Sequence, residues 1–375
     1  MFEARVLRRL GREVTVFSWI KSVASPLPEE EVRDGLRIRR RKVAAPRGLL
    51  GRTVGFRRIT KQFAEEIGSL RPDAIICHDL EMLWASVRAG RALRIPVLYH
   101  AHEDWPAMVS ERSRLEGLIF GLLERRLVRF VDHIYAAGEE RARRYRRWGK
   151  AVTVIYGAKS LSEMPPVSEA DRLAIRAAAG FAATDDVVGI AGSLGRDEAV
   201  PTVLDALALL PESVKLYIVG GGERKVAETK ALVEAGGMSS RVSFTGRLPT
   251  PEYLRQTAAI DVGLALYFPT TKNQTTVVPL KLFDYMGLGI PIVGSDFAEL
   301  RRIITNLCGC GATTDPEDPE ALRRAVEALL RDRAGRQEMG RRARECFQTR
   351  FCQERQEEAL QRSHPVFAAG ADRQG

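Results

Sequence analysis

The sequence has few cysteines, and it has no hydrophobic run of the ~18 to 20 residues that a membrane-spanning helix needs. Its first residues also lack the apolar core of a signal peptide, which predicts a cytoplasmic protein, soluble or peripheral on the inner face of the cell membrane. None of the five cysteines forms a C-x-x-C pair or a set with zinc-ligand spacing. We therefore expect reduced, mostly buried thiols at Cys77, Cys308, Cys310, Cys346 and Cys352.

Acidic residues are in the minority: the sequence contains 48 Asp and Glu and 58 Lys and Arg, which gives a formal net charge of +10. This balance favours anionic partners such as nucleotides or an anionic membrane surface, although free use of Arg on solvated faces explains it equally well. No aromatic platform or recognised motif for nucleic acid is present, so nucleic acid is not an expected partner. The length of 375 residues is sufficient for two α/β domains, each with its own core.

In the first half, strands and helices alternate, and polar residues follow the strands. The chain opens on a helix at Phe2–Leu10 and continues into a strand at Glu13–Trp19. A charged edge strand is predicted at Arg37–Val43. Two further strands, at 73–77 and 96–99, run directly into polar clusters, and such clusters fall on the ligand-binding edge of an α/β sheet. A parallel sheet normally has a strand before its first helix, and this chain shows none there.

The clusters contain histidines, His78 after one strand and the segment 100–104 after the next. Histidines with nearby acids are compatible with a metal site, but H-x-H at a strand end is not the helical spacing of a zinc site. A second interpretation is a histidine that faces a bound sugar or phosphate, with Glu103 or Asp104 orienting it. A third is a histidine that only satisfies local backbone, above all at His100.

The second half repeats the pattern with glycine-rich strand ends. A buried strand at 187–191 ends in Gly192-Ser193-Leu194-Gly195-Arg196, and the strand at 215–219 runs into Gly220-Gly221-Gly222. Glycines let the backbone approach a ligand closely, and free amides at a helix start suit a phosphate. The stretch 273–293 adds polar residues on a short helix before another buried strand. Two α/β halves in tandem, facing each other across a cleft, are therefore predicted.

Several segments resemble the group 1 glycosyltransferases of family 4, which have the GT-B fold. They are LYHAHEDWP, IAGSLGR, LYIVGGGE, VSFTGRLP and, most specifically, PLKLFDYMGLGIPIVGSD, and the resemblance extends from Glu3 to about Leu360. It implies an N-terminal acceptor-side domain at 1–160 and a donor domain at 170–349, with the C-terminal helix at about 350–365 packing back on the first domain. It further implies retaining transfer of a sugar from a nucleotide-diphosphate donor without a metal cofactor.

The resemblance also assigns site residues. His102 matches the family histidine that contacts the transferred sugar, and it is the catalytic candidate. Asp284 matches the second acid of an E-x7-E motif, which binds the donor ribose, while Thr276 stands where the first Glu would be. Lys281 is placed to suit the diphosphate. The predicted donor-binding residues are Gly192, Ser193, Arg196, Gly221, Arg247, Leu248, Thr276, Val277, Lys281 and Asp284.

Four departures from the family pattern keep a second hypothesis open. Thr276 replaces the first glutamate, the cations of G-R-x4-K-G are replaced by Ser193 and Glu198, with Arg196 as a possible substitute, and the family's first strand and glycine loop do not precede the first helix. Either the segment is encoded upstream or the protein lacks it. The leading prediction is a hexosyltransferase acting on a glycan or lipid-linked acceptor in polysaccharide or glycoconjugate biosynthesis. The alternative is a non-catalytic GT-B protein that binds nucleotide or scaffolds a polysaccharide complex.

Overall fold

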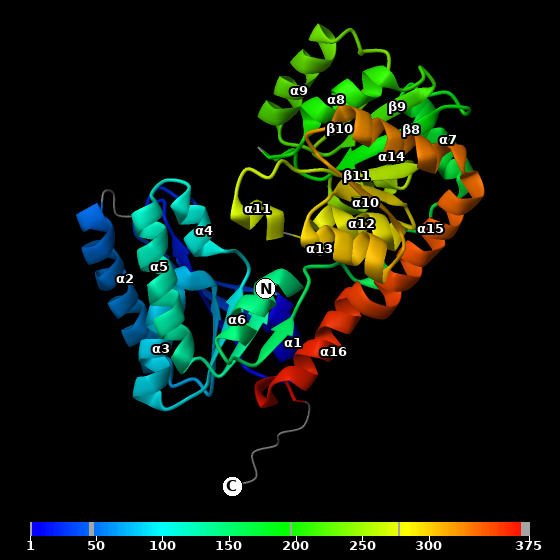
Figure 1. Cartoon of the computed structure of the whole chain (residues 1–375). Coiled ribbons are helices and arrows are strands. Elements are labelled where there is room, and N and C mark those ends of the chain that lie inside the picture. The colour runs from blue at the N-terminus through cyan, green and yellow to red at the C-terminus, as the bar shows by residue number, and fades with distance from the viewer. Residues whose placement is uncertain (1, 45–48, 196, 277, 369–375) are drawn as a thin grey trace. The chain divides into compact units, whose positions relative to one another are not determined.

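The computed structural model describes residues 2–44, 49–195, 197–276 and 278–368, which fall into two compact units (Figure 1). Unit 1 comprises residues 1–136, 142–155 and 357–375, and unit 2 comprises residues 137–141 and 156–356. Within the described ranges, no helix is both long enough and apolar enough to cross a membrane.

Unit 1 contains two β-sheets. Parallel strands form the first in the order β4-β5-β6-β7, and the second has the order β1-β3-β2. Their bounds are β1 Thr15–Ile20, β2 Glu30–Arg33, β3 Leu36–Lys42, β4 Ile75–His78, β5 Val97–Ala101, β6 His133–Ala136 and β7 Val152–Val154. The helices are α1 Phe2–Arg9, α2 Leu49–Leu70, α3 Asp79–Leu93, α4 Trp105–Ser110, α5 Arg114–Leu127 and α6 Glu139–Arg147, with the 3-10 turn η1 Val128–Phe130. The first residues of α6, up to Arg141, are assigned to unit 2.

Alternate residues of the four-stranded sheet enter two different cores. Ile75, Val97 and Tyr99 pack with residues of α2, α3 and α5, whereas Leu98 and Tyr135 pack with Val6 and Leu7 of α1 and with Leu360 near the chain end. Successive side chains of a strand point to opposite faces, so both faces of this sheet are covered. The carboxyl ends of β4 and β5 are consequently the part of the sheet that remains available to a ligand.

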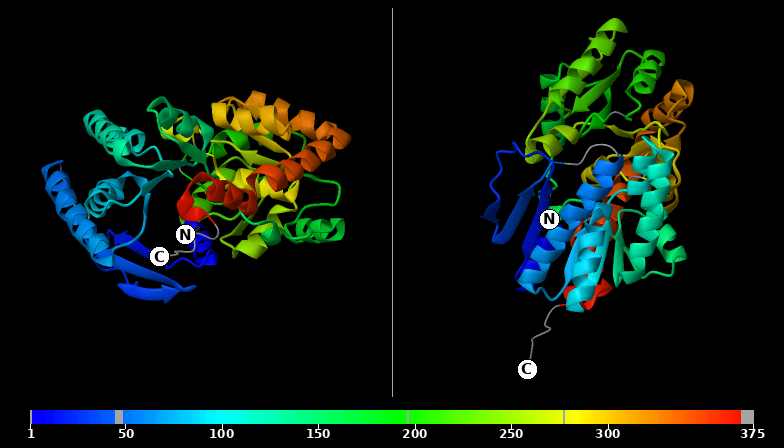
Figure 2. Two further views of the ribbon diagram at one scale, coloured as in Figure 1. Left: turned by 90° about the horizontal axis from the view of Figure 1, so that it is seen from below. Right: turned by 90° about the vertical axis from the view of Figure 1, so that its left-hand side faces the viewer.

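The three-stranded sheet corrects one prediction and adds a strand that the sequence analysis missed. The charged strand β3 is not an edge strand, because it lies between β1 and β2. β2 is antiparallel to β3 and joined to it by Asp34 and Gly35, which have φ angles of 52° and 70° (Figure 2). An Asp-Gly pair with two positive φ angles is the preferred two-residue hairpin turn, so this dipeptide was the signal that could have revealed β2.

Unit 2 is built on one parallel sheet of six strands in the order β10-β9-β8-β11-β12-β13. Their bounds are β8 Asp186–Ala191, β9 Val214–Val219, β10 Val242–Gly246, β11 Val262–Ala265, β12 Ile292–Ser295 and β13 Gly311–Thr314. The order of the strands reverses between β8 and β11. In an open α/β sheet this reversal creates the crevice in which ligands bind, outside the carboxyl ends of the strands.

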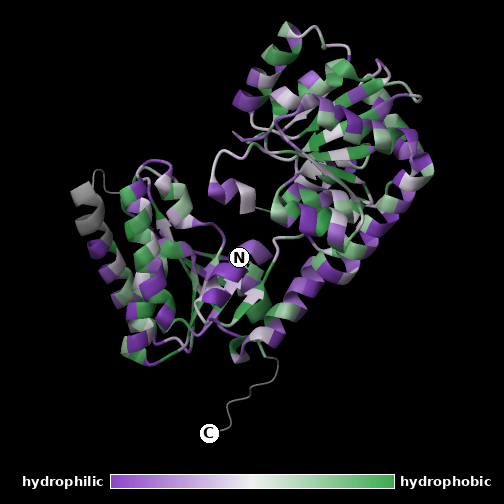
Figure 3. Cartoon of the chain, in the orientation of Figure 1, coloured by the Kyte–Doolittle hydropathy of each residue, from purple (hydrophilic) through white to green (hydrophobic). Residues whose placement is uncertain are grey.

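Helices cover both faces of this sheet. The helices are α7 Glu169–Ala178, α8 Val200–Leu209, α9 Glu223–Ala235, α10 Thr250–Thr257, α11 Lys272–Thr276, α12 Leu280–Leu288, α13 Ala298–Arg301, α14 Pro319–Arg331 and α15 Arg333–Cys346, and α16 Gln353–Ser363 continues into unit 1. Short turns are η2 Leu161–Glu163, η3 Arg302–Leu307, η4 Phe347–Phe351 and η5 Pro365–Phe367. Val187 and Val188 enter separate cores, and Figure 3 shows the sheet as largely hydrophobic. The buried parallel strands explain the continuous apolar runs in the sequence.

The cysteines are only partly as predicted. Cys77, Cys310 and Cys352 are free and buried, as expected. Cys308 and Cys346 form a disulfide between the end of η3 and the end of α15, so the prediction of reduced thiols is wrong for this pair. The pairing joins residues 38 positions apart in the sequence, and it depends on how α15 packs in unit 2. No spacing rule could have indicated it.

Candidate functional site

The candidate site in unit 2 lies at the carboxyl ends of its central strands, where three glycines bring the backbone together. Gly192 follows β8, Gly220 follows β9, and Gly246 ends β10. Gly220 has a φ angle of 101° and forms an isolated bridge with Gly246. A Cβ atom at Gly220 would lie 2.7 Å from the carbonyl oxygen of Gly192, so only glycine fits there. The glycines thus form a close-packed backbone rim beside the strand reversal.

Helix α12 contributes two buried charged side chains to this edge. Lys281 and Asp284 are 6% and 3% exposed and lie one turn apart. A Cβ atom at Gly192 would lie 3.7 Å from both Cε of Lys281 and the hydroxyl oxygen of Tyr253. The structure therefore brings together three of the predicted donor-binding residues, namely Gly192, Lys281 and Asp284, and adds Tyr253 of α10.

Lys281 is paired with Glu198, the acid that stands where the family pattern has a lysine. Its ammonium group donates to Oε1 of Glu198, which is 5% exposed. Burial raises the pKa of Glu198, while the charge of Lys281 and its hydrogen bond act in the opposite direction. Glu198 also accepts a hydrogen bond from the backbone N–H of Gly195 at 3.2 Å. The family lysine is thus replaced by an acid that holds a different lysine at the same edge of the sheet.

Asp284 has two partners, and both were missed from the sequence. Lys159 lies 2.5 Å from its Oδ1 atom, and the hydroxyl of Tyr253 donates to its Oδ2 atom at 2.9 Å. Burial, followed by the charge of Asp284, raises the pKa of Tyr253, so the phenol remains a donor. A carboxylate has about four lone-pair sites, so these two partners leave room for further donors such as ribose hydroxyls.

The remaining predicted donor-binding residues are dispersed along the same edge or lie outside the described residues. Gly221 has a φ angle of 92° and is buried against Leu194, whereas Ser193 and Arg247 are exposed. Leu248 lines a separate cavity of about 210 Å³. The hydroxyl of Thr276 donates to the carbonyl of Asn273 at 3.0 Å, within its own helix. Arg196 and Val277 fall outside the residues that the structure describes.

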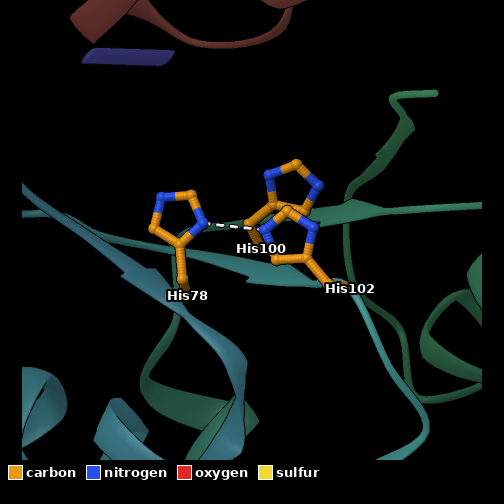
Figure 4. A group of neighbouring side chains, drawn as sticks. All are labelled: His78, His100 and His102. Carbon is orange, nitrogen blue, oxygen red and sulfur yellow. Dashed lines mark hydrogen bonds between the residues drawn. The ribbon is translucent and has the colours of Figure 1, made fainter. Parts of the chain in front are cut away.

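In unit 1, His102 belongs to a group of three imidazoles at the carboxyl ends of β4 and β5 (Figure 4). Its Nε2 atom lies 2.8 Å from Nδ1 of His78 in a hydrogen bond, and its ring stacks on His100 with centroids 3.9 Å apart. Burial lowers the pKa of His78 to about 4 and, together with the charge of His100, lowers that of His102 to about 4. Both imidazoles are therefore neutral near pH 7.

His100 is fixed by a residue from the beginning of the chain. It is 3% exposed, and its Nδ1 atom donates to the carboxylate of Glu3 on α1, which is 2% exposed. Burial raises the pKa of Glu3, but the hydrogen bond from His100 and its charge hold that pKa well below the usual range. His100 thus has a specific buried partner rather than only local backbone, and nothing in the sequence near His100 indicates Glu3.

The sequence suggested Glu103 or Asp104 as the residue that orients the histidine, and this stays a prediction. Asp104 caps α4 by accepting from the N–H of Ala107 at 3.2 Å, and it pairs with Arg144 at 2.9 Å. Asp79 holds the loop, because its Oδ1 atom accepts from the backbone N–H of His102 at 3.0 Å and of Glu103 at 3.4 Å. Asp79 itself has a φ angle of 59°, a conformation that Asp and Asn tolerate better than other side chains.

This arrangement predicts the effect of replacing Asp79. Asp79→Ala leaves two backbone donors of the His102 loop without their acceptor and places alanine in the left-handed region, so we expect a loss of about 1 to 3 kcal/mol in the free energy of unfolding. Asp79→Asn keeps an acceptor oxygen and the tolerance for a positive φ, and it should remain within about 1 kcal/mol of wild type. Urea denaturation followed by circular dichroism measures both. Equal losses for the two variants would contradict the role given to this carboxyl.

Comparisons with known proteins agree with the division of the chain into two units. The family described as Glycosyltransferase Family 4 matches residues 3–159, and the family described as Glycosyl transferases group 1 matches residues 185–332. No curated protein matches the chain.

Solved structures resemble the chain over nearly its whole length. They include sucrose-phosphate synthase from Thermosynechococcus elongatus, with 21% identity, coverage of 96% of this chain and 89% of that one, and a TM-score of 0.73. HepE from Anabaena, solved with UDP and glucose, has 18% identity, coverage of 88% and 86%, and a TM-score of 0.67. WaaG, a glycosyltransferase involved in lipopolysaccharide biosynthesis, has 18% identity, coverage of 97% and 95%, and a TM-score of 0.63. The chain therefore belongs to the group 1 glycosyltransferases with a family 4 N-terminal domain, and it has the GT-B fold.

Proposed function

We propose that the protein transfers a hexose from a nucleotide-diphosphate sugar, with UDP as the first candidate, to a glycan or lipid-linked acceptor. The transfer proceeds with retention at the anomeric carbon and serves polysaccharide or glycoconjugate biosynthesis. The observation that carries this proposal is the buried Lys281–Glu198 pair beside Gly192, at the strand reversal of unit 2. HepE, which shares the fold, was solved with UDP and with UDP-glucose, and this supports the choice of the base.

Each residue has a defined part in this proposal. Lys281 exchanges part of its contact with Glu198 for the diphosphate, whose charge grows as the sugar leaves, and preorganised cations at such a position supply a large part of catalysis. Asp284 accepts hydrogen bonds from the ribose hydroxyls, held in orientation by Tyr253 and Lys159. His102 is the proposed catalytic residue of unit 1. No metal cofactor is part of the proposal.

A donor panel tests the proposal directly. The chain is incubated with UDP-, GDP- and ADP-sugars, release of the nucleoside diphosphate is measured, and the anomeric configuration of the product is read by NMR. We expect turnover with a UDP-sugar and retained configuration. Binding of a nucleotide without any turnover would instead favour the non-catalytic GT-B protein, for which Thr276 in place of a glutamate is the motivating observation.

Helix α5 supports the further proposal that the protein binds an anionic membrane surface. Leu115, Leu118, Ile119 and Leu122 are 60%, 61%, 47% and 60% exposed, and their spacing places them on one face of the helix. Exposed arginines flank this apolar face at both ends, and they are Arg112, Arg114, Arg125, Arg126 and Arg129. An apolar stripe with flanking cations suits insertion between anionic headgroups, which attract juxtamembrane arginines by about 1 kcal/mol each.

Vesicle binding tests this surface. Leu118→Gln/Leu122→Gln should weaken binding to phosphatidylglycerol-containing vesicles at least about 10-fold, because burying each leucine contributes roughly 1.5 to 3 kcal/mol when complete. The matched control is Leu209→Gln/Leu232→Gln, since these leucines on α8 and α9 are each 49% exposed but lie outside the stripe. Cosedimentation measures all three proteins. Equal binding by both variants would contradict the proposal. Vesicle binding that does not depend on the presence of the anionic lipid would contradict it as well.

A further inference from the structure

Glu198 is held by three groups at the carboxyl edge of the sheet in unit 2. Its buried carboxylate accepts hydrogen bonds from the ammonium group of Lys281, from the backbone N–H of Gly195 at 3.2 Å and from the hydroxyl of Tyr267. Tyr267 follows β11, and an isolated bridge joins its backbone to that of Glu198. The carboxylate therefore cannot turn toward solvent without breaking contacts to α12, to its own loop and to the segment after β11.

The positive charge among these partners is the ammonium group on α12. Two phenols, Tyr267 and Tyr285, also interact with the charge of Glu198, and burial is the main reason that the pKa of each phenol is raised. Both phenols therefore stay protonated near neutral pH. Asp197, the neighbour of Glu198 in the sequence, accepts a hydrogen bond from the hydroxyl of Thr270 at 2.9 Å. The charge of the buried carboxylate is thus compensated by the lysine rather than by the groups around it.

Binding of a diphosphate changes this compensation. Lys281 extends along the rim at Gly192, so its ammonium group is the part of the site that Glu198 and a bound diphosphate would share. The carboxylate then loses part of its compensating charge and gains a neighbouring anion. A buried carboxyl group responds to both changes in the same direction, because burial and a nearby negative charge each favour its neutral form.

We propose that Glu198 takes up one proton from solvent when the nucleoside diphosphate binds and releases it when the diphosphate leaves. This inference rests on the proposed function, because it requires the diphosphate to share Lys281. Protonation converts a carboxylate that only accepts hydrogen bonds into a carboxyl group that also donates one. The acid that replaces the family lysine is thus paired with Lys281 in the free protein and neutral in the complex.

Calorimetry in buffers with different enthalpies of ionisation counts the protons that accompany binding. The full chain is titrated with UDP at about pH 7 in PIPES and in Tris, at equal ionic strength. We expect net uptake of about 0.5 to 1 proton per UDP. UDP itself acts in the opposite direction, because its terminal phosphate, with a pKa of about 6, is about one-tenth protonated at this pH and releases that proton on meeting a cation. Net uptake therefore comes from the protein.

Glu198→Gln tests whether this residue takes the proton. Glutamine keeps the size of the side chain and cannot be protonated, so binding of UDP to this variant should show no net uptake. The matched control is Asp261→Asn, because Asp261 is another carboxylate of unit 2 that pairs with arginines, and it precedes β11 at the amino end of the sheet. Asp261→Asn should take up as many protons as wild type.

The pH dependence of the affinity for UDP needs no variant, so it also decides the question if Glu198→Gln is too unstable to titrate. Uptake of a proton on binding requires the affinity to fall as the pH rises, by up to about 10-fold per pH unit. We expect wild type to bind UDP about 3- to 10-fold more weakly at about pH 8 than at about pH 7. Ionisation of the terminal phosphate alone would strengthen binding over the same range.

The proposal is overturned if wild type binds UDP without net uptake of a proton, if its affinity does not fall with rising pH, or if Glu198→Gln takes up as many protons as wild type. Each of these results leaves the proposed function standing, because UDP binds. If wild type binds no UDP, the proposed diphosphate site is wrong, and the proton uptake is wrong with it.

Discussion

Replacing Lys281 with methionine is expected to lower kcat/KM for the sugar-nucleotide donor by about 10²- to 10³-fold, the loss typical of removing one preorganised group that stabilises developing negative charge. The side chain is 6% exposed and lies beside Gly192 at the strand reversal, so water cannot readily replace it. Methionine keeps the length and the apolar stem of the lysine and removes only the charge. The effect should appear in kcat as well as in KM, because the leaving diphosphate is more negatively charged than the bound donor.

For Lys281→Met, a loss of catalytic activity must be separated from a loss of folding stability. Lys281→Met leaves Glu198 buried without its cation, and breaking a buried pair from one side costs roughly 3 to 5 kcal/mol. Protonation of Glu198 reduces this cost, since burial already raises the pKa of that carboxyl. The double variant Glu198→Gln/Lys281→Met removes both charges, and it should regain most of the stability while remaining as inactive as the single variant.

Glu198→Gln completes this set. It leaves Lys281 buried without a carboxylate partner, so the free protein should be less stable, by roughly 3 kcal/mol. UDP restores an anion next to the lysine, and a ligand that binds only the folded form raises its apparent stability. The increase in melting temperature on adding UDP should therefore be larger for Glu198→Gln than for wild type. An equal increase would show that Lys281 and the diphosphate do not meet.

Asp284→Asn should reduce kcat/KM about 10- to 150-fold, mainly through a higher KM for the donor. Hydrogen bonds to a charged group contribute about 1.5 to 3 kcal/mol, and the substitution removes the charge while keeping the volume and an acceptor for Tyr253. The measurement is initial-rate kinetics with the donor varied at a fixed acceptor concentration.

Asp261 provides a matched control for Asp284. It is another carboxylate of unit 2 with two side-chain partners, in its case Arg172 at 2.9 Å and Arg176 at 2.8 Å. It precedes β11, so it lies at the amino end of the sheet, opposite the candidate site. Asp261→Asn should cost stability and leave the KM for the donor unchanged. A similar rise in KM for both variants would mean that the Asp284 effect is a general consequence of weakening unit 2.

The sequence was sufficient to predict the two α/β halves because their strands are buried on both faces and read as short apolar runs between glycines. The hairpin of β2 was missed although Asp34-Gly35 signals it, because two charged strands do not show the hydrophobic pattern of a core strand. Charged strands of this kind are determined by their pairing rather than by their own composition.

The partners of the candidate residues could not be predicted from the sequence. Glu198 lies 83 residues from Lys281, and Lys159 lies 125 residues from Asp284. Such pairs are brought together only by the order of the strands in the sheet, which local patterns do not encode. The same holds for Glu3 and His100, 97 residues apart. The family resemblance therefore singled out Lys281, Asp284 and His102 as candidates, while the groups that set their charge and orientation required the three-dimensional structure.

Titration calorimetry of UDP tests the central claim most directly, that the edge of unit 2 around Lys281 binds a nucleoside diphosphate. Wild type and the stable double variant Glu198→Gln/Lys281→Met are compared at the same ionic strength. We predict one UDP per chain for wild type and affinity at least about 10-fold lower for the double variant, which corresponds to a loss of about 1.4 kcal/mol. Equal affinities, or no binding of UDP, GDP or ADP by wild type, would contradict the account.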